Sequence, residues 1–147
     1  MSKTQSRAQI QSPIAGSGWQ AFKQLVPERL GLGPHAIQIF NELTVAAKSG
    51  QPVTTILLAA TLADVALYEG ASYQFDDDEM AGMGIDWLSA GERRRLDGLR
   101  ARRNALVHHE GPVDGLMDQA GDADLLATDA DKALAAVVPL LEGLEHF

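Results

Sequence analysis

The chain has 147 residues and carries 12 Lys and Arg against 20 Asp and Glu, which gives a formal charge of −8. Its hydrophobic content of 46% excludes wholesale disorder, and a chain of this length folds as one domain without a metal or a crosslink. The absence of cysteine excludes disulfides, a thiol nucleophile and cysteine-based zinc sites. The acidic balance and the few aromatic residues exclude a general DNA-coating protein.

The N-terminal region is predicted to be a tail followed by a short helix. Residues 1–16 are rich in Ser, Gln and Gly, and we expect a flexible tail there. Ser17 is positioned to cap a short helix that ends before Pro27. Residues 17–147 are then expected to form a single helical-bundle domain.

The sequence shows no targeting signal and no membrane span. Residues 1–11 are polar and are followed by no apolar run, unlike a secretory signal. The longest apolar stretch, 56–63, is interrupted by Thr61 and falls far short of the roughly 20 residues that a spanning helix needs. We therefore expect a cytoplasmic protein with no membrane partner.

Two apolar helices are predicted next. The first begins at Pro34, because proline at the first helical position loses no needed hydrogen bond, and it ends at Gly50, a left-handed stop. The second begins at Pro52 and runs to about Tyr73. It is apolar nearly all round, with Asp64 as its lone carboxylate up to residue 68, and such a helix is usually surrounded by others.

An acidic segment separates these helices from the third long one. Residues 76–79 are Asp-Asp-Asp-Glu, without the ligand spacing of a calcium loop, so we expect a solvated loop that extends to about Trp87. Contact with the arginines of a neighbouring copy is the alternative. Ser89 and Glu92 have capping-box spacing and predict a helix over about 90–109.

The last helix is predicted after a Gly- and Asp-rich loop over 113–124. Thr128 and Asp131 give a cap signal, apolar residues at helical spacing follow, and Pro139 is expected to kink or split the helix. No alternating strand pattern occurs. The predicted fold is all-α: an up-and-down bundle of four main helices with an extra short N-terminal helix.

Positive charge is concentrated in the third long helix. The stretch from Arg93 to Arg103 contains six arginines and Asp97 and carries +5, so the residues outside this stretch carry −13. The forked guanidinium suits phosphate or carboxylate, so the arginines are candidates for binding an anionic partner. The alternative is that they form an exposed helix face that balances the charge of acidic neighbours. These six arginines are Arg93, Arg94, Arg95, Arg100, Arg102 and Arg103.

Arg103 differs from the other five because the helical spacing places it in an apolar stripe with Leu99 and Leu106. Its head group needs an acidic or solvent partner, and Asp64 is the natural candidate. The pair is either structural or part of a functional site. In the structural case, loss of Arg103 would leave a buried, unpaired carboxylate at a cost of about 3–5 kcal/mol.

Two further polar residues follow Arg103. Asn104 and His108 are four residues apart and share one helix face, whereas Arg103 and His108 lie about 140° apart around the axis. A site built from this helix alone is therefore shallow, and a second copy across a two-fold axis would close it. Adjacent helical side chains point about 100° apart, so His108 and His109 cannot chelate together, and no metal site is predicted.

The run Arg103-Asn104-Ala105-Leu106-Val107-His108 resembles the signature of the HEPN superfamily, an Arg often followed by Asn with a His a few residues on, near the end of the third long helix of a small bundle. The preceding apolar helix with Asp64 is similar to the family's apolar helix with one acidic residue. The resemblance covers roughly 34–147, and its specific part is the six-residue run.

The resemblance implies an all-α homodimer that, in active members, cleaves RNA without metal or cofactor. Carried over to this chain, His108 is the general acid/base and Arg103 stabilises the phosphate, while Asn104 orients the site and Asp64 holds Arg103. Such an endoribonuclease would belong to a toxin, defence or stress system, with an antitoxin-like protein as partner. The alternative is a non-catalytic dimerisation or interaction module of the same fold.

The side chains suit this chemistry. Histidine exchanges protons near neutral pH, and arginine offers a fixed charge to phosphate oxygens. The neighbouring arginines would hold the flanking RNA backbone. They are Arg93, Arg94, Arg95, Arg100 and Arg102.

Overall fold

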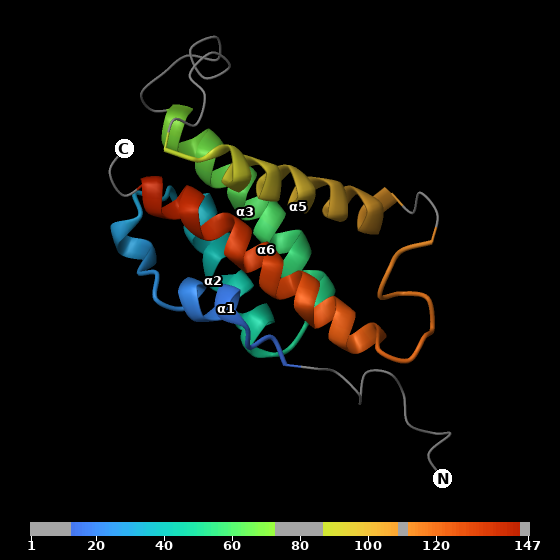
Figure 1. The fold of residues 1–147 in the computed structure, drawn as a ribbon. Helices are drawn as coiled ribbons and strands as arrows, with labels where there is room; N and C mark the ends of the chain where they lie inside the picture. Colours follow the sequence, from blue (N-terminus) through green and yellow to red (C-terminus); the bar gives the residue numbers. More distant parts are fainter. Residues whose placement is uncertain (1–12, 73–86, 109–111, 145–147) are drawn as a thin grey trace.

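The computed structural model describes residues 13–72, 87–108 and 112–144 (Figure 1). In chain order its elements are α1 (Ser17–Phe22), the 3₁₀ helix η3 (Pro27–Arg29), α2 (Pro34–Lys48), α3 (Pro52–Ser72), α5 (Ala90–His108) and α6 (Asp122–Leu144). No strand occurs in these ranges, so the predicted all-α class is confirmed. Most of the expected N-terminal tail and all of the acidic segment 76–79 lie outside the described residues.

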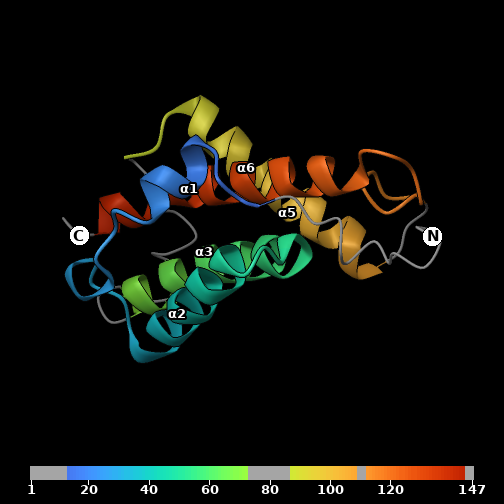
Figure 2. The same cartoon turned by 90° about the horizontal axis from the view of Figure 1, so that it is seen from below.

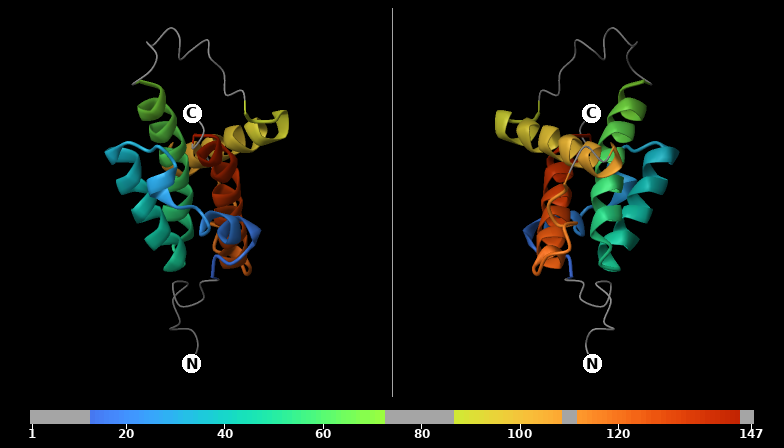
Figure 3. Two further views of the ribbon diagram at one scale, coloured as in Figure 1. Left: turned by 90° about the vertical axis from the view of Figure 1, so that its left-hand side faces the viewer. Right: turned by 90° about the vertical axis from the view of Figure 1, so that its right-hand side faces the viewer.

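Helix α3 is the central element. It packs chiefly against α6 on one side and α2 on the other, and α1 lies on the outer side of α6 (Figures 1 and 2). Helix α5 contacts both α3 and α6 and lies crosswise over them (Figure 3). The largest fully buried hydrophobic side chains come from α1, α2, α3 and α6, and they are Phe22, Leu43, Ile56, Leu62, Leu134, Val137, Leu140 and Leu141.

The apolar character of α3 explains its central place, because a helix without a polar face must be covered by its neighbours. None of the described helices has the length and apolar character that a membrane span requires. The finer expectation, that four helices alternate up and down, stays a prediction.

Most of the predicted helix ends are confirmed. α2 begins with Pro34 as its first residue and is followed by Gly50 with a φ of 68°, and α3 begins at Pro52. At the start of α5 the backbone nitrogen of Ser89 donates to Glu92 Oε1 at 2.8 Å, while the nitrogen of Glu92 donates to Ser89 Oγ at 3.1 Å. This is the predicted capping box.

The predicted cap of α1 is wrong. Ser17 is the first residue of the helix, Gly16 is the N-cap, and no local side chain caps it. Instead Asp131 of α6 accepts hydrogen bonds from the backbone nitrogens of Gly18 at 3.0 Å and Trp19 at 2.8 Å. The cap therefore comes from more than a hundred residues away, which local sequence patterns cannot reveal.

The predicted start of the last helix is also wrong. α6 begins at Asp122, six residues before Thr128, and continues as one helix through Pro139. The Asp122 carboxylate accepts hydrogen bonds from the backbone nitrogens of Met117 at 3.1 Å and Gln119 at 2.9 Å, which fixes the entry to the helix. Buried residues line the helix on both sides of Pro139, so tertiary packing outweighs the hydrogen bond that proline removes.

Candidate functional site

Helix α5 carries all the basic candidate residues. It packs on α3 and α6 with a narrow stripe of apolar side chains. Leu96 and Leu99 are buried in this stripe, and Leu106 is half-buried. Arginines flank the stripe on both sides. Helical geometry directs one set towards α3 and the other towards α6.

On the α3 side, one carboxylate binds two arginines. Asp64 Oδ2 accepts a hydrogen bond from Arg103 Nη1 at 3.1 Å, so the expected Asp64–Arg103 pair is confirmed. Asp64 Oδ1 accepts two more from Arg100, from Nε at 3.0 Å and from Nη2 at 2.8 Å. Sequence reasoning missed Arg100 as a partner, although its three-residue spacing from Arg103 places both on one helix face.

Asn104 holds the Arg103 guanidinium from the other side. Its Oδ1 atom accepts hydrogen bonds from Arg103 Nε at 3.2 Å and from Nη2 at 3.1 Å. With Asp64 on Nη1, these bonds leave one N–H on each terminal nitrogen for an outside acceptor. The Arg103 side chain as a whole is 28% exposed, so it is partly open to solvent.

His108 lies apart from this cluster. It is exposed as the last residue of α5, and it makes no hydrogen bond or ion pair with the described residues. Its neighbour Val107 is also exposed, with 56% of its surface open to solvent. Within one copy, His108 and Arg103 point away from each other around the helix axis by about 140°.

Arg100 and Arg102, both among the five arginines expected to hold RNA, bind carboxylates of other helices. Arg100 binds Asp64, and Arg102 binds Asp129 of α6 through Nη2 at 2.8 Å and also donates to the backbone carbonyl of Asp114. Arg102 Nε is buried without an acceptor among the described residues. The other three, Arg93, Arg94 and Arg95, are exposed on the first turns of α5.

The part of the chain that the structure describes contains no group of three or more His, Asp or Glu side chains arranged to hold a metal ion. His109, the other member of the histidine pair, lies outside the described residues. The described side chains that can do chemistry here are therefore the Asp64–Arg103–Asn104 cluster and His108.

The double pairing of Asp64 changes the expected stability of one variant. Its side chain is 40% exposed and retains Arg100 when Arg103 is removed, so the penalty for a buried, unpaired carboxylate does not arise. We expect Arg103→Ala to lower the free energy of unfolding by less than about 1 kcal/mol in urea titrations. A loss near 3 kcal/mol or more would contradict the shared pairing.

Comparison with protein-family models, with curated proteins and with solved structures gave no match. The functional argument therefore rests on the side chains themselves. Asp64, Arg103 and Asn104 form one connected, partly exposed cluster, and His108 extends the same helix by one further turn.

Proposed function

We propose that the protein is a HEPN-like, metal-independent endoribonuclease that acts as a homodimer. The observation that carries the proposal is the set of hydrogen bonds made by Arg103. The carboxylate of Asp64 and the amide oxygen of Asn104 fix its guanidinium, and two of its N–H groups remain for an outside anion. An arginine that served only to neutralise Asp64 would not need Asn104. The proposal includes the four-helix arrangement of that superfamily.

The proposed reaction uses the 2′-hydroxyl of RNA as its nucleophile. His108 removes the hydroxyl proton, the 2′-oxygen forms a bond to the adjacent phosphorus, and the bond from phosphorus to the 5′-oxygen breaks. A proton from the second histidine of the dimer protonates that leaving oxygen. Arg103 donates to the non-bridging oxygens, where negative charge develops in the transition state. The products are a 2′,3′-cyclic phosphate and a 5′-hydroxyl.

A second copy supplies what one copy lacks. His108 is exposed and directed away from Arg103, so a single chain does not enclose a phosphate. Pairing the C-terminal halves of two α5 helices across a two-fold axis would bring both motifs to one cleft and would cover Val107. The exposed Arg93, Arg94 and Arg95 would then flank the cleft and bind RNA backbone.

The chemistry of the product ends tests this mechanism. A mixed RNA pool incubated with the purified protein in EDTA should yield fragments with 2′,3′-cyclic phosphate and 5′-hydroxyl ends, because no water or metal takes part in the first step. End-specific ligation and mass spectrometry distinguish these ends from the 3′-hydroxyl and 5′-phosphate ends that two-metal nucleases leave. Fragments of the latter kind, or cleavage that stops in EDTA, would contradict the proposal.

A second candidate function is a non-catalytic dimerisation or interaction module of the same fold. The observation in its favour is that Asp64 binds both Arg100 and Arg103, which ties α5 to α3 and gives the motif a structural role. An intact dimer that cleaves no RNA under any of these conditions would support this function. In a toxin or defence system, an antitoxin-like protein would then be the expected partner of either form.

A further inference from the structure

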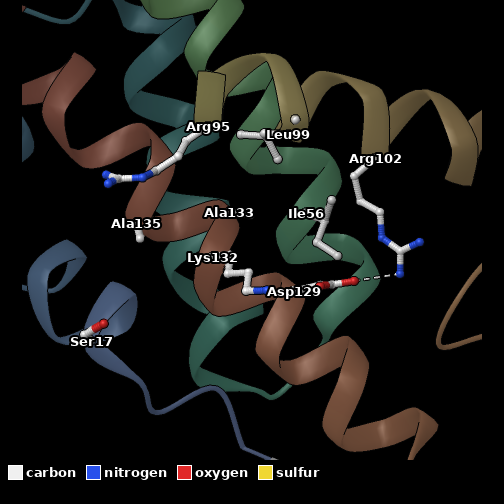
Figure 4. Close-up of a pocket in the computed structure, with 10 residues that line it drawn as sticks. Ser17, Ile56, Arg95, Leu99, Arg102, Asp129, Lys132, Ala133 and Ala135 are labelled. Carbon is white, nitrogen blue, oxygen red and sulfur yellow. Dashed lines mark ion pairs between the residues drawn. The ribbon is translucent and has the colours of Figure 1, made fainter. Parts of the chain in front are cut away.

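A groove of about 750 Å³ lies between α5 and α6 (Figure 4), and Asp64 is not among its lining residues. Ile56 of α3, Leu99 of α5 and Ala133 of α6 give it an apolar lining. Its volume lies within the range of about 300–1,000 Å³ that is typical of small-molecule sites. No aromatic side chain is among its lining residues, so the groove offers an aliphatic surface rather than a stacking platform.

The charged residues of the groove leave a local excess of positive charge. Asp129 is neutralised by its ion pair with Arg102 at one end (Figure 4). Arg95 on α5 and Lys132 on α6 are exposed and make no ion pair with the described residues. On a chain with a formal charge of −8, two cations of this kind beside an apolar lining favour a ligand with an anionic head and an apolar tail.

Gly98 leaves one part of the groove wall without a side chain. It lies on the face of α5 that carries Arg95 and Arg102, and it lines the groove between them. A Cβ atom there would meet nothing within 4 Å, and its backbone is helical, so neither packing nor conformation requires glycine. Glycine in the middle of a helix is destabilising, and here it leaves open space at the groove.

We propose that this groove binds an aliphatic carboxylate, with its tail along Ile56, Leu99 and Ala133 and its head held by Arg95 and Lys132. Charge-assisted hydrogen bonds from the two cations select the anionic head, and removal of the aliphatic chain from water supplies the remaining affinity. The proposal does not depend on ribonuclease activity, because decanoate binding is measured without RNA and the groove contains no residue of the Asp64–Arg103–Asn104 cluster. Among the groove residues, Arg95 is also proposed to bind RNA backbone.

Titration calorimetry of the full chain with decanoate, below its micelle-forming concentration, tests the proposal. We expect one decanoate bound per chain, and binding weaker by about tenfold or more for decanol and for decylammonium, which lack the anionic head. Equal binding of decanoate and decylammonium would overturn the assignment of Arg95 and Lys132. No binding of decanoate would overturn the site as a whole.

Three variants locate the site. Gly98→Leu fills the groove and strengthens the helix, so we expect loss of decanoate binding by about tenfold or more with an unchanged or raised Tm. Arg95→Gln should weaken binding by about tenfold, whereas Arg94→Gln, on the same helix but outside the groove, should leave it unchanged. Wild-type affinity in Gly98→Leu, or equal losses in the two arginine variants, would contradict binding in this groove.

Discussion

Replacing His108 with alanine is expected to reduce EDTA-resistant RNA cleavage by about 10²–10⁴-fold, the usual contribution of a positioned general acid or base. Its side chain is exposed at the last residue of α5 and makes no hydrogen bond with the described residues. The substitution therefore removes no hydrogen bond or ion pair within the described part of the chain, and circular dichroism and Tm should stay at their wild-type values. The measurement is the initial rate of cleavage of one purified fragment.

His35→Ala is the matched control for this variant. His35 is also exposed on a helix, in the first turn of α2, and lies outside the candidate site. It should retain the wild-type rate, which excludes a general effect of removing a histidine. If His108→Ala cleaves as fast as His35→Ala, the activity belongs to a contaminant or to other residues, and the proposed role of His108 is wrong.

Gly18→Ala is expected to lower the free energy of unfolding by about 3 kcal/mol, the upper end of what an overpacked core residue costs. Gly18 is buried where α1 crosses α6, and an added Cβ would overlap the backbone carbonyl oxygen of Asp131 and lie 2.9 Å from the nitrogen of Ala135. Neither atom can move without shifting α6. The helix would therefore be displaced, which weakens the two hydrogen bonds that Asp131 accepts and the stacking of Phe22 on Phe40 at 4.8 Å.

The same substitution at a second helical glycine provides the control. An added Cβ at Gly98 meets nothing within 4 Å, so Gly98→Ala should raise the free energy of unfolding by about 1 kcal/mol through helix propensity alone. Urea titrations of both variants measure the difference. Equal effects in the two variants would show that α1 does not pack on α6 in the way described.

The two proposals for α5 divide this helix into two functional sides. Arg100 and Arg103 face α3 and meet Asp64, whereas Arg95 and Arg102 face the groove towards α6. A ribonuclease site would use the first side and the end of the helix, and an aliphatic carboxylate would occupy the second. Variants of Arg100 and Arg103 should therefore leave decanoate binding unchanged, whereas Arg95 variants should affect both readouts, because Arg95 is also expected to bind RNA backbone.

Local signals in the sequence determined the helical class and most helix ends. Pro34, Gly50 and Pro52 act through their own backbone preferences, and Ser89 and Glu92 bond to each other within one turn, so their effects do not depend on the rest of the fold. The Asp64–Arg103 pair was also predictable, because each is a lone charge within an otherwise apolar stripe, and such charges need partners.

Only the tertiary structure decided the features that depend on contacts between distant residues. Asp131 looked like part of a local cap signal, yet it caps α1 across the bundle, and α6 begins earlier because Asp122 binds the preceding loop. Arg100 joins Arg103 on Asp64, so a pair that sequence reasoning treated as buried and solitary is shared and partly exposed. The groove beside Gly98 forms only when α5 lies across α6. Spacing along one helix specifies which residues share a face, whereas the packing of three helices specifies what that face meets.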